Sequence, residues 1–218
     1  MQNTLAPWGE LVGDPRHPLT PDDLSALPDD GWRYELVEGR LVRMPGTGLE
    51  HLEVTDNLHA ALRAYVKANR LGLVTLPDTA FRLVPDTVLM PDIGFLGLGK
   101  TQALPAWGSQ ARKKYIPFAP DLAVEVASPD QHRREMGDKA RLYLQFGAGL
   151  IWVIWPADQA DQQVDVWLAN TTQPATQPAT AVLPASPTQT LGMGQTLDGL
   201  TIVPGLMFAV ADLFQPFV

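Results

Sequence analysis

The stretch Pro120-Asp121-Leu-Ala-Val-Glu125-Val-Ala-Ser128 sets a glutamate inside a nearly continuous apolar run. Such a run is typical of a β-strand that is covered on both faces. Burying a carboxylate there is costly unless a positive charge or a cation compensates it. The strand therefore predicts a buried partner for Glu125, which is either a functional cation or a structural salt bridge.

Two further charged side chains flank this strand in the sequence. Upstream, Val88-Leu-Met-Pro-Asp92-Ile-Gly-Phe95 is predicted as a short strand that carries Asp92. Downstream, residues 135–146 are predicted as a helix that ends before Gly147 and carries Lys139 near its centre. Carboxylates bind divalent cations, and an ammonium beside the cation can orient or deprotonate a water. The three residues suggest metal-assisted hydrolysis, with phosphodiesters as the favoured substrate class.

The other apolar patterns predict an α/β fold. Residues 50–69 carry apolar residues at helical spacing and form the clearest helix. The tight-turn signal Glu38-Gly39 separates two apolar-rich runs, which predicts a β-hairpin with Glu35 in its first strand. The hairpin strands are predicted at 32–37 and 40–44, further strands at 73–76, 80–84, 150–155, 163–168 and 199–203, and further helices at 21–28 and 204–214.

The chain is predicted to form one domain over residues 19–218, preceded by an N-terminal arm over residues 1–18. Its 218 residues, 45% of them hydrophobic, suffice for one substantial core. Residues 170–190 repeat Thr-Gln-Pro-Ala and carry no charged side chain. We therefore predict that this segment is a low-complexity surface insertion.

Composition excludes several classes of protein. No apolar run approaches the ~20 residues that a membrane-spanning helix needs, and the N-terminus lacks the pattern of a signal peptide. We therefore expect a soluble, cytoplasmic protein with no membrane partner. Because the chain has no cysteine, it cannot form disulfides, thiolate metal sites or a cysteine nucleophile. Any metal site must use oxygen or imidazole ligands.

The net charge of -8 counts against a protein that relies on nonspecific phosphate contacts. Two basic clusters, Arg112-Lys113-Lys114 and His132-Arg133-Arg134, lie on either side of the acidic strand. They could meet a phosphate backbone, but solvated loop charge explains them equally well.

Several short motifs occur in an order that resembles a known family. They are Tyr34 to Gly39, His51, Pro91-Asp92, Pro120 to Pro129, Lys139 with Tyr143, Gly147 with Leu150 to Ile154, and Val203 to Leu206. Over about residues 20–214, the chain resembles the Uma-type putative restriction endonuclease family of the PD-(D/E)XK nuclease superfamily. The resemblance implies a restriction-endonuclease-like fold with a mixed central sheet flanked by helices. It also implies an endonuclease that uses Mg²⁺ or Mn²⁺ to cut DNA. Because Gly192-Met-Gly194 is not followed by a phosphate-binding pattern, we expect no nucleotide cofactor.

The resemblance also implies roles for particular residues. Asp92 matches the metal-binding aspartate and Glu125 the acidic residue of the second motif strand, with the main-chain carbonyl of Val126 as a further ligand. In the superfamily a lysine often stands two positions after that acidic residue, but here Ala127 occupies the position. Lys139 on the following helix matches the family's relocated lysine.

Glu35 matches an early glutamate that supports the metal site in many superfamily members, and an exposed hairpin residue is its alternative. For Asp92 the alternative is a turn residue after Pro91, and for Lys139 it is ordinary helix-surface charge. His51 is predicted to form a hydrogen bond at a helix start rather than to bind metal, because no second histidine stands at metal-binding spacing.

Two functions remain open at this point. The first is the metal-dependent endonuclease, for which a homodimer is plausible because one site cuts one strand and duplex cleavage is simplest with two. The second is a noncatalytic descendant that keeps the nuclease fold as a binding or assembly module. The acidic net charge favours the module, whereas Asp92, Glu125 and Lys139 together favour the enzyme.

Overall fold

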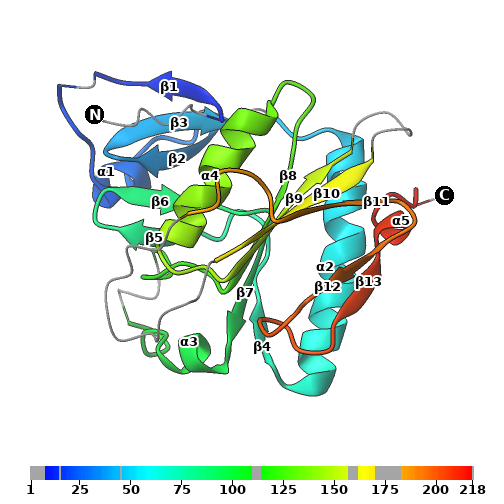
Figure 1. Cartoon of the computed structure of the whole chain (residues 1–218). Helices are drawn as coiled ribbons and strands as arrows, with labels where there is room; N and C mark the ends of the chain where they lie inside the picture. The colour runs from blue at the N-terminus through cyan, green and yellow to red at the C-terminus, as the bar shows by residue number, and fades with distance from the viewer. Residues whose placement is uncertain are drawn as a thin grey trace.

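The computed structural model describes residues 8–14, 16–44, 46–109, 114–156, 162–169 and 183–217 (Figure 1). The described elements in chain order are β1 (Glu10–Val12), α1 (Pro21–Ser25), β2 (Arg33–Val37), β3 (Arg40–Met44), α2 (Leu49–Asn69), β4 (Gly72–Val74), β5 (Phe81–Val84), β6 (Thr87–Leu89), β7 (Ile93–Gly97), α3 (Leu98–Gln102), β8 (Leu122–Val126), α4 (Arg133–Gln145), β9 (Leu150–Trp155), β10 (Gln163–Leu168), β11 (Gln189–Gly192), β12 (Thr196–Asp198), β13 (Met207–Ala209) and α5 (Val210–Leu213).

The central sheet is mixed, as predicted. Its strand order is β11-β10-β9-β8-β7-β4, with β8 and β9 parallel and the other neighbours antiparallel. A second, antiparallel sheet has the order β1-β3-β2-β6-β5, and β12 pairs with β13. Since a parallel pair cannot be joined by a tight turn, the chain between β8 and β9 must cross over the sheet, and α4 is this crossover.

Helices α2 and α4 belong to two different layers of the core. On β8, Leu122, Val124 and Val126 pack in one hydrophobic cluster with the buried stripe of α2. The alternate residues Ala123 and Ala127 pack in another cluster with α4. Successive side chains of a strand point to opposite faces, so Glu125 lies on the α4 face.

The hairpin, α2, β8 and α4 occur where the sequence predicts them, but the segment 88–95 is not one strand. It is divided into β6, in the antiparallel sheet, and β7, in the central sheet. Pro91 lies at the division, and proline cannot donate a hydrogen bond to a sheet. The chain therefore passes from one sheet to the other at Met90–Asp92.

The C-terminal prediction is wrong in part. Residues 199–203 form a turn rather than a strand, because Leu200 has φ +51° and the Val203 N–H donates to the Gly199 carbonyl at 2.8 Å. Of the helix predicted at 204–214, only α5 is helical, and β13 precedes it. Sequence patterns also did not predict β1, α3, β11 and β12. Arg112, Lys113 and residues 170–182 of the predicted insertion lie outside the described residues.

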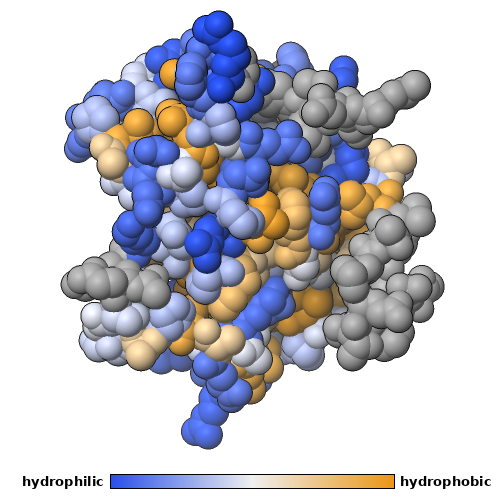
Figure 2. Space-filling view, turned by 90° about the vertical axis from the view of Figure 1, so that its left-hand side faces the viewer, coloured by the Kyte–Doolittle hydropathy of each residue, from blue (hydrophilic) through white to orange (hydrophobic). Residues whose placement is uncertain are grey.

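Hydrophilic and hydrophobic residues share the surface. On the face drawn in Figure 2, hydrophilic residues prevail at the top and left, while hydrophobic residues gather towards the centre. Within the described residues, no helix combines the length and apolar character that crossing a membrane requires.

The core packing of α2 can be tested on two leucines of the same helix. Leu58 is fully buried, whereas Leu52 is 54% exposed. We expect Leu58→Ala to lower the free energy of unfolding by about 2–5 kcal/mol, because it leaves a cavity between α2 and the sheet. Leu52→Ala should change it by less than about 0.5 kcal/mol in the same urea denaturation. Equal effects of the two substitutions would contradict this packing.

Candidate active site

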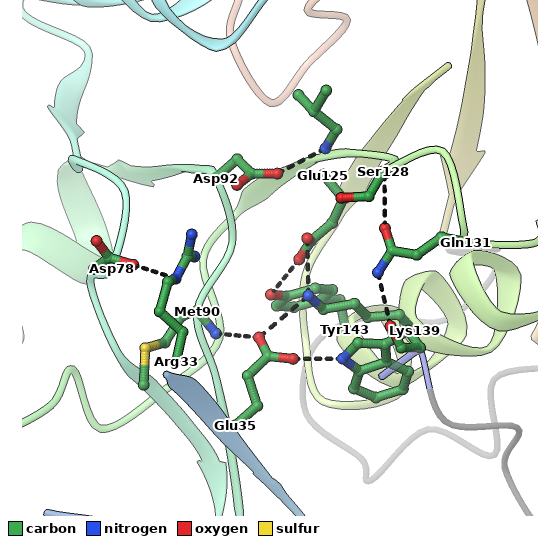
Figure 3. Close-up of polar contacts among 12 residues, drawn as sticks. Arg33, Glu35, Asp78, Met90, Asp92, Glu125, Ser128, Gln131, Lys139 and Tyr143 are labelled. Atoms are coloured by element: carbon green, nitrogen blue, oxygen red, sulfur yellow. Dashed lines mark hydrogen bonds and ion pairs between the residues drawn. The ribbon is translucent and has the colours of Figure 1, made fainter. Parts of the chain in front are cut away.

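The predicted site residues meet where the two larger sheets join (Figure 3). Glu35 comes from β2 of the antiparallel sheet, and Glu125 comes from β8 of the central sheet. Asp92 lies at the passage between the sheets, and Lys139 comes from α4. None of the four residues is more than 6% exposed. The fold thus gathers three carboxylates and one ammonium in a buried position.

Glu125 is held by two donors from α4. The Lys139 ammonium donates to its Oε2 at 2.8 Å, and the Tyr143 hydroxyl donates to its Oε1 at 2.8 Å. Lys139 and Tyr143 are one helical turn apart and therefore point to the same side. Ala123 and Ala127, the neighbours of Glu125 on this face of β8, are small and leave room for both side chains.

Glu35 is the second partner of the ammonium. Its Oε1 lies 3.2 Å from Lys139 Nζ and accepts a hydrogen bond from the Met90 N–H at 2.6 Å. Its Oε2 accepts a hydrogen bond from the indole N–H of Trp8. With 1% exposure, Glu35 is not the exposed hairpin residue that the sequence left open.

Asp92 connects the passage between the sheets to the end of β8 and the start of α2. Its Oδ2 accepts a hydrogen bond from the Val126 N–H at 2.7 Å. The same oxygen lies 3.3 Å from Nε2 of His51. His51 thus pairs with Asp92 near the start of α2, in agreement with its predicted hydrogen-bonding role.

Burial and the surplus of carboxylates shape the proton affinities. Burial raises the pKa of Glu125 to about 8; Lys139 acts to lower it, while Asp92 and Glu35 add to the rise. Burial acts to lower the pKa of Lys139, but Glu125 and Glu35 outweigh it and raise that pKa. Burial, followed by the charges of Glu125 and Glu35, raises the pKa of Tyr143 well above its ordinary value. Lys139 and Tyr143 therefore remain protonated at neutral pH.

Asp92 responds in the opposite direction. Burial acts to raise its pKa, but the hydrogen bond and charge of His51, the Val126 N–H and the charge of Lys139 together hold it below its ordinary value. Asp92 is therefore ionised at neutral pH. Both oxygens of Glu125 accept hydrogen bonds, as those of a carboxylate do, yet burial, together with the charges of Asp92 and Glu35, favours a proton on Glu125.

The residues fit a hard divalent cation. Asp92, Glu125 and Val126 line a pocket of about 20 Å³, which is room for about one water molecule or ion. Arg33 also lines this pocket, and its guanidinium is paired with Asp78 at 2.7 Å. Carboxylate oxygens have spare lone pairs beside the hydrogen bonds they accept, and Mg²⁺ needs only one or two protein carboxylates together with waters. Among the residues that the structure describes, no three aspartate, glutamate or histidine side chains are arranged to hold a metal by themselves. A cation here would complete its shell with main-chain and water oxygens.

A larger cleft of about 700 Å³ adjoins this pocket. The two share His51, Ser128 and Gln131, and the cleft extends between Gly48 and Trp155. No lysine or arginine of the described chain lines the cleft. Its polarity comes mainly from Glu50, His51, Ser128 and glutamines.

Several other charged residues near β8 and α4 in the sequence have partners outside this centre. Asp121, at the start of the strand that carries Glu125, pairs with the Lys100 ammonium at 2.9 Å. Glu135 accepts a hydrogen bond from the His132 N–H and caps α4. In the basic clusters, Lys114 pairs with Asp22 and Arg133 pairs with the buried Asp165 at 2.7 Å. Neither lines the small pocket or the cleft.

Sequence reasoning missed Trp8. It lies in the predicted N-terminal arm, yet it is 1% exposed and contacts the site. The only signal was an isolated aromatic residue, which does not distinguish a surface tryptophan from a buried one. Tyr143 stands with Lys139 in one of the family motifs, but its hydrogen bond to Glu125 does not follow from sequence spacing alone.

The fold and the site together define a restriction-endonuclease-like α/β protein. The chain belongs to the Uma2 family, described as "Putative restriction endonuclease", whose model matches residues 21–210. A solved structure from Anabaena variabilis, described as a "putative nuclease belonging to DUF820", is similar in fold, with a TM-score of 0.69 and 21% identity. The match covers 90% of this chain and 98% of that chain. No curated protein matches the sequence. The family supports a nuclease function in general terms.

Glu125 should make the stability of the protein depend on pH. Its pKa is raised from 4.5 to about 8, so between these values the folded protein holds a proton that the unfolded chain releases. Stability from this group is therefore present at low pH and is lost as pH rises through the window. The pKa of Asp92 is lowered, so Asp92 changes the pH dependence of stability only below this window.

We expect the free energy of unfolding of the wild type to decrease from pH 5 to pH 8. The slope of this decrease should exceed the slope measured for Glu125→Gln by up to about 1.4 kcal/mol per pH unit. Urea denaturation without added metal measures both slopes. Parallel curves for the two proteins would show that Glu125 does not titrate in this range.

Proposed function

We propose that this protein is a metal-dependent endonuclease that hydrolyses phosphodiester bonds of DNA. The observation that carries the proposal is the 2.8 Å contact between Lys139 and Glu125. The superfamily's usual lysine position is taken by Ala127, so catalysis of this type depends on another ammonium at the same carboxylate. Helix α4 supplies one.

Asp92, Glu125 and the main-chain carbonyl of Val126 are the residues that we propose hold Mg²⁺ or Mn²⁺. When bound, such a cation polarises the phosphate and lowers the pKa of a coordinated water. The cleft beside the pocket would receive the nucleotides that flank the cut bond.

The side chains around the proposed metal have separate tasks. An ammonium has three donors, and the contacts of Lys139 with Glu125 and Glu35 use two of them. The third is suited to orient the attacking water, and the positive charge stabilises the charge that develops on the phosphate. Glu35 and Tyr143 hold Lys139 and Glu125 in place.

A homodimer in the cytoplasm completes the proposal. One small active site cuts one strand, and two sites related by a twofold axis would cut both strands of a duplex. The molecular mass in solution, measured by light scattering with and without duplex DNA, tests this assembly.

The lysine can be moved to test the proposal. We expect Lys139→Ala to reduce Mn²⁺-dependent cleavage of DNA by about 100-fold or more, since it removes the charge that orients water and stabilises the phosphate. Because residues 125 and 127 lie on one face of β8, the double variant Lys139→Ala/Ala127→Lys should recover part of the loss. Lys67→Ala, on the exposed end of α2, is the matched control and should cleave normally.

Activity that survives both Lys139→Ala and Glu125→Gln would contradict this mechanism. Each variant needs a thermal denaturation curve, so that loss of folding is not mistaken for loss of chemistry.

The second candidate is a noncatalytic binding or assembly module with the nuclease fold. The net charge of -8 and the absence of described lysines and arginines from the cleft favour it. Calorimetric titration with Mn²⁺ separates the two functions. The enzyme requires binding that Asp92→Asn weakens, whereas absent binding, or binding unchanged in Asp92→Asn, favours the module.

A further inference from the structure

Trp8 lies before the region that the family model matches, yet its side chain contacts both Glu35 and Lys139. Its side chain is 1% exposed, and its indole N–H donates to Oε2 of Glu35. The centroid of its ring lies 5.4 Å from the Lys139 ammonium. A cation at this distance is attracted by the ring of a tryptophan, more strongly where water is excluded.

The backbone around Trp8 is fixed by several contacts. Strand β1 pairs with β3 directly after it, with Glu10 opposite Arg43. The Gln131 side-chain amide donates to the Trp8 carbonyl at 2.7 Å. A Cβ atom on Gly9 would lie 2.3 Å from the Arg43 carbonyl oxygen, so a side chain there would push the segment away from β3. The backbone at Trp8 is thus held in position by β3 and by Gln131.

The contact with Glu35 has a consequence for Lys139. Its ammonium is shared between Glu125 at 2.8 Å and Glu35 at 3.2 Å. Without the indole donor, Oε2 of Glu35 would be a buried acceptor with no remaining hydrogen bond among the described residues. A buried carboxylate oxygen without a partner is costly, so it would compete for the ammonium.

We propose that Trp8 is a positioning residue: its indole occupies Glu35 and closes the space around Lys139, which keeps the ammonium on Glu125. The catalytic part of this inference rests on the proposed nuclease function. Trp8 does not touch the cleft or the small pocket, so it acts through Glu35 and Lys139 and not on the substrate.

The first test is Trp8→Phe, which keeps an aromatic ring but removes the N–H donor. We expect the single-turnover rate of DNA cleavage to fall about 10- to 100-fold, because a small displacement of a catalytic group costs that much. The dissociation constant for DNA should stay unchanged. The matched control is Trp32→Phe, since Trp32 is 48% exposed and lines, together with Trp8 and Arg43, a pocket separate from the proposed metal pocket and the cleft. This control should leave both constants unchanged.

Two further measurements do not need activity. The chain has six tryptophans, so its ¹H–¹⁵N spectrum should contain six indole N–H signals, of which the one lost in Trp8→Phe belongs to Trp8. That signal should exchange slowly with solvent and should move in Glu35→Gln.

In addition, acetic anhydride should modify Lys139 more readily in Trp8→Ala than in the wild type, relative to the exposed Lys67. Trp32→Ala should not have this effect.

The outcomes separate the two proposals. If the wild type cleaves no DNA but the indole signal and Lys139 modification respond as expected, the nuclease proposal fails while Trp8 still encloses Lys139. An indole signal that ignores Glu35→Gln, or Lys139 modification unchanged in Trp8→Ala, overturns the role of Trp8. So does a normal cleavage rate in Trp8→Phe.

Discussion

A single ammonium between two buried glutamates is the interaction on which the site depends. Lys139 lies 2.8 Å from Glu125 and 3.2 Å from Glu35, and Asp92 adds a third carboxylate nearby. His51 pairs with Asp92, and Arg33, which lines the same pocket, pairs with Asp78 at 2.7 Å, so Lys139 is the cation that faces both glutamates. Burial, together with the charges of Asp92 and Glu35, raises the pKa of Glu125 against the effect of Lys139. Such an arrangement is expensive for a purely structural core, because buried charges stabilise a fold only when they are fully compensated. A divalent cation would supply the missing charge.

The topology explains why the lysine can come from a helix. Strands β8 and β9 are parallel, so the chain between them must cross one face of the sheet. The crossover helix α4 lies over the face of β8 that presents Glu125. Ala127, in the position of the superfamily's lysine, is small enough for the longer side chains from α4 to enter. In the site that we propose, the ammonium therefore comes from α4 and not from β8.

Much of the fold around the site could be predicted from the sequence, because these elements depend on local patterns. The apolar run around Glu125, the helical spacing of residues 50–69 and the Glu38-Gly39 turn each predict an element that the structure contains. Contacts between distant segments could not be predicted. Trp8 reaches Glu35 across 27 residues, and its burial depends on the pairing of β1 with β3. The passage of the chain between two sheets at Asp92 likewise depends on tertiary packing.

The central claim is that Asp92, Glu125 and Lys139 together form a metal-dependent catalytic centre. A crystal structure of the protein soaked in Mn²⁺, with anomalous scattering to locate the ion, tests it most directly. We predict one manganese ion in the small pocket, bound by Asp92, Glu125 and the Val126 carbonyl, with the Lys139 ammonium beside Glu125. An empty pocket at saturating Mn²⁺, or an ion bound elsewhere while Lys139 points away from Glu125, would contradict the account.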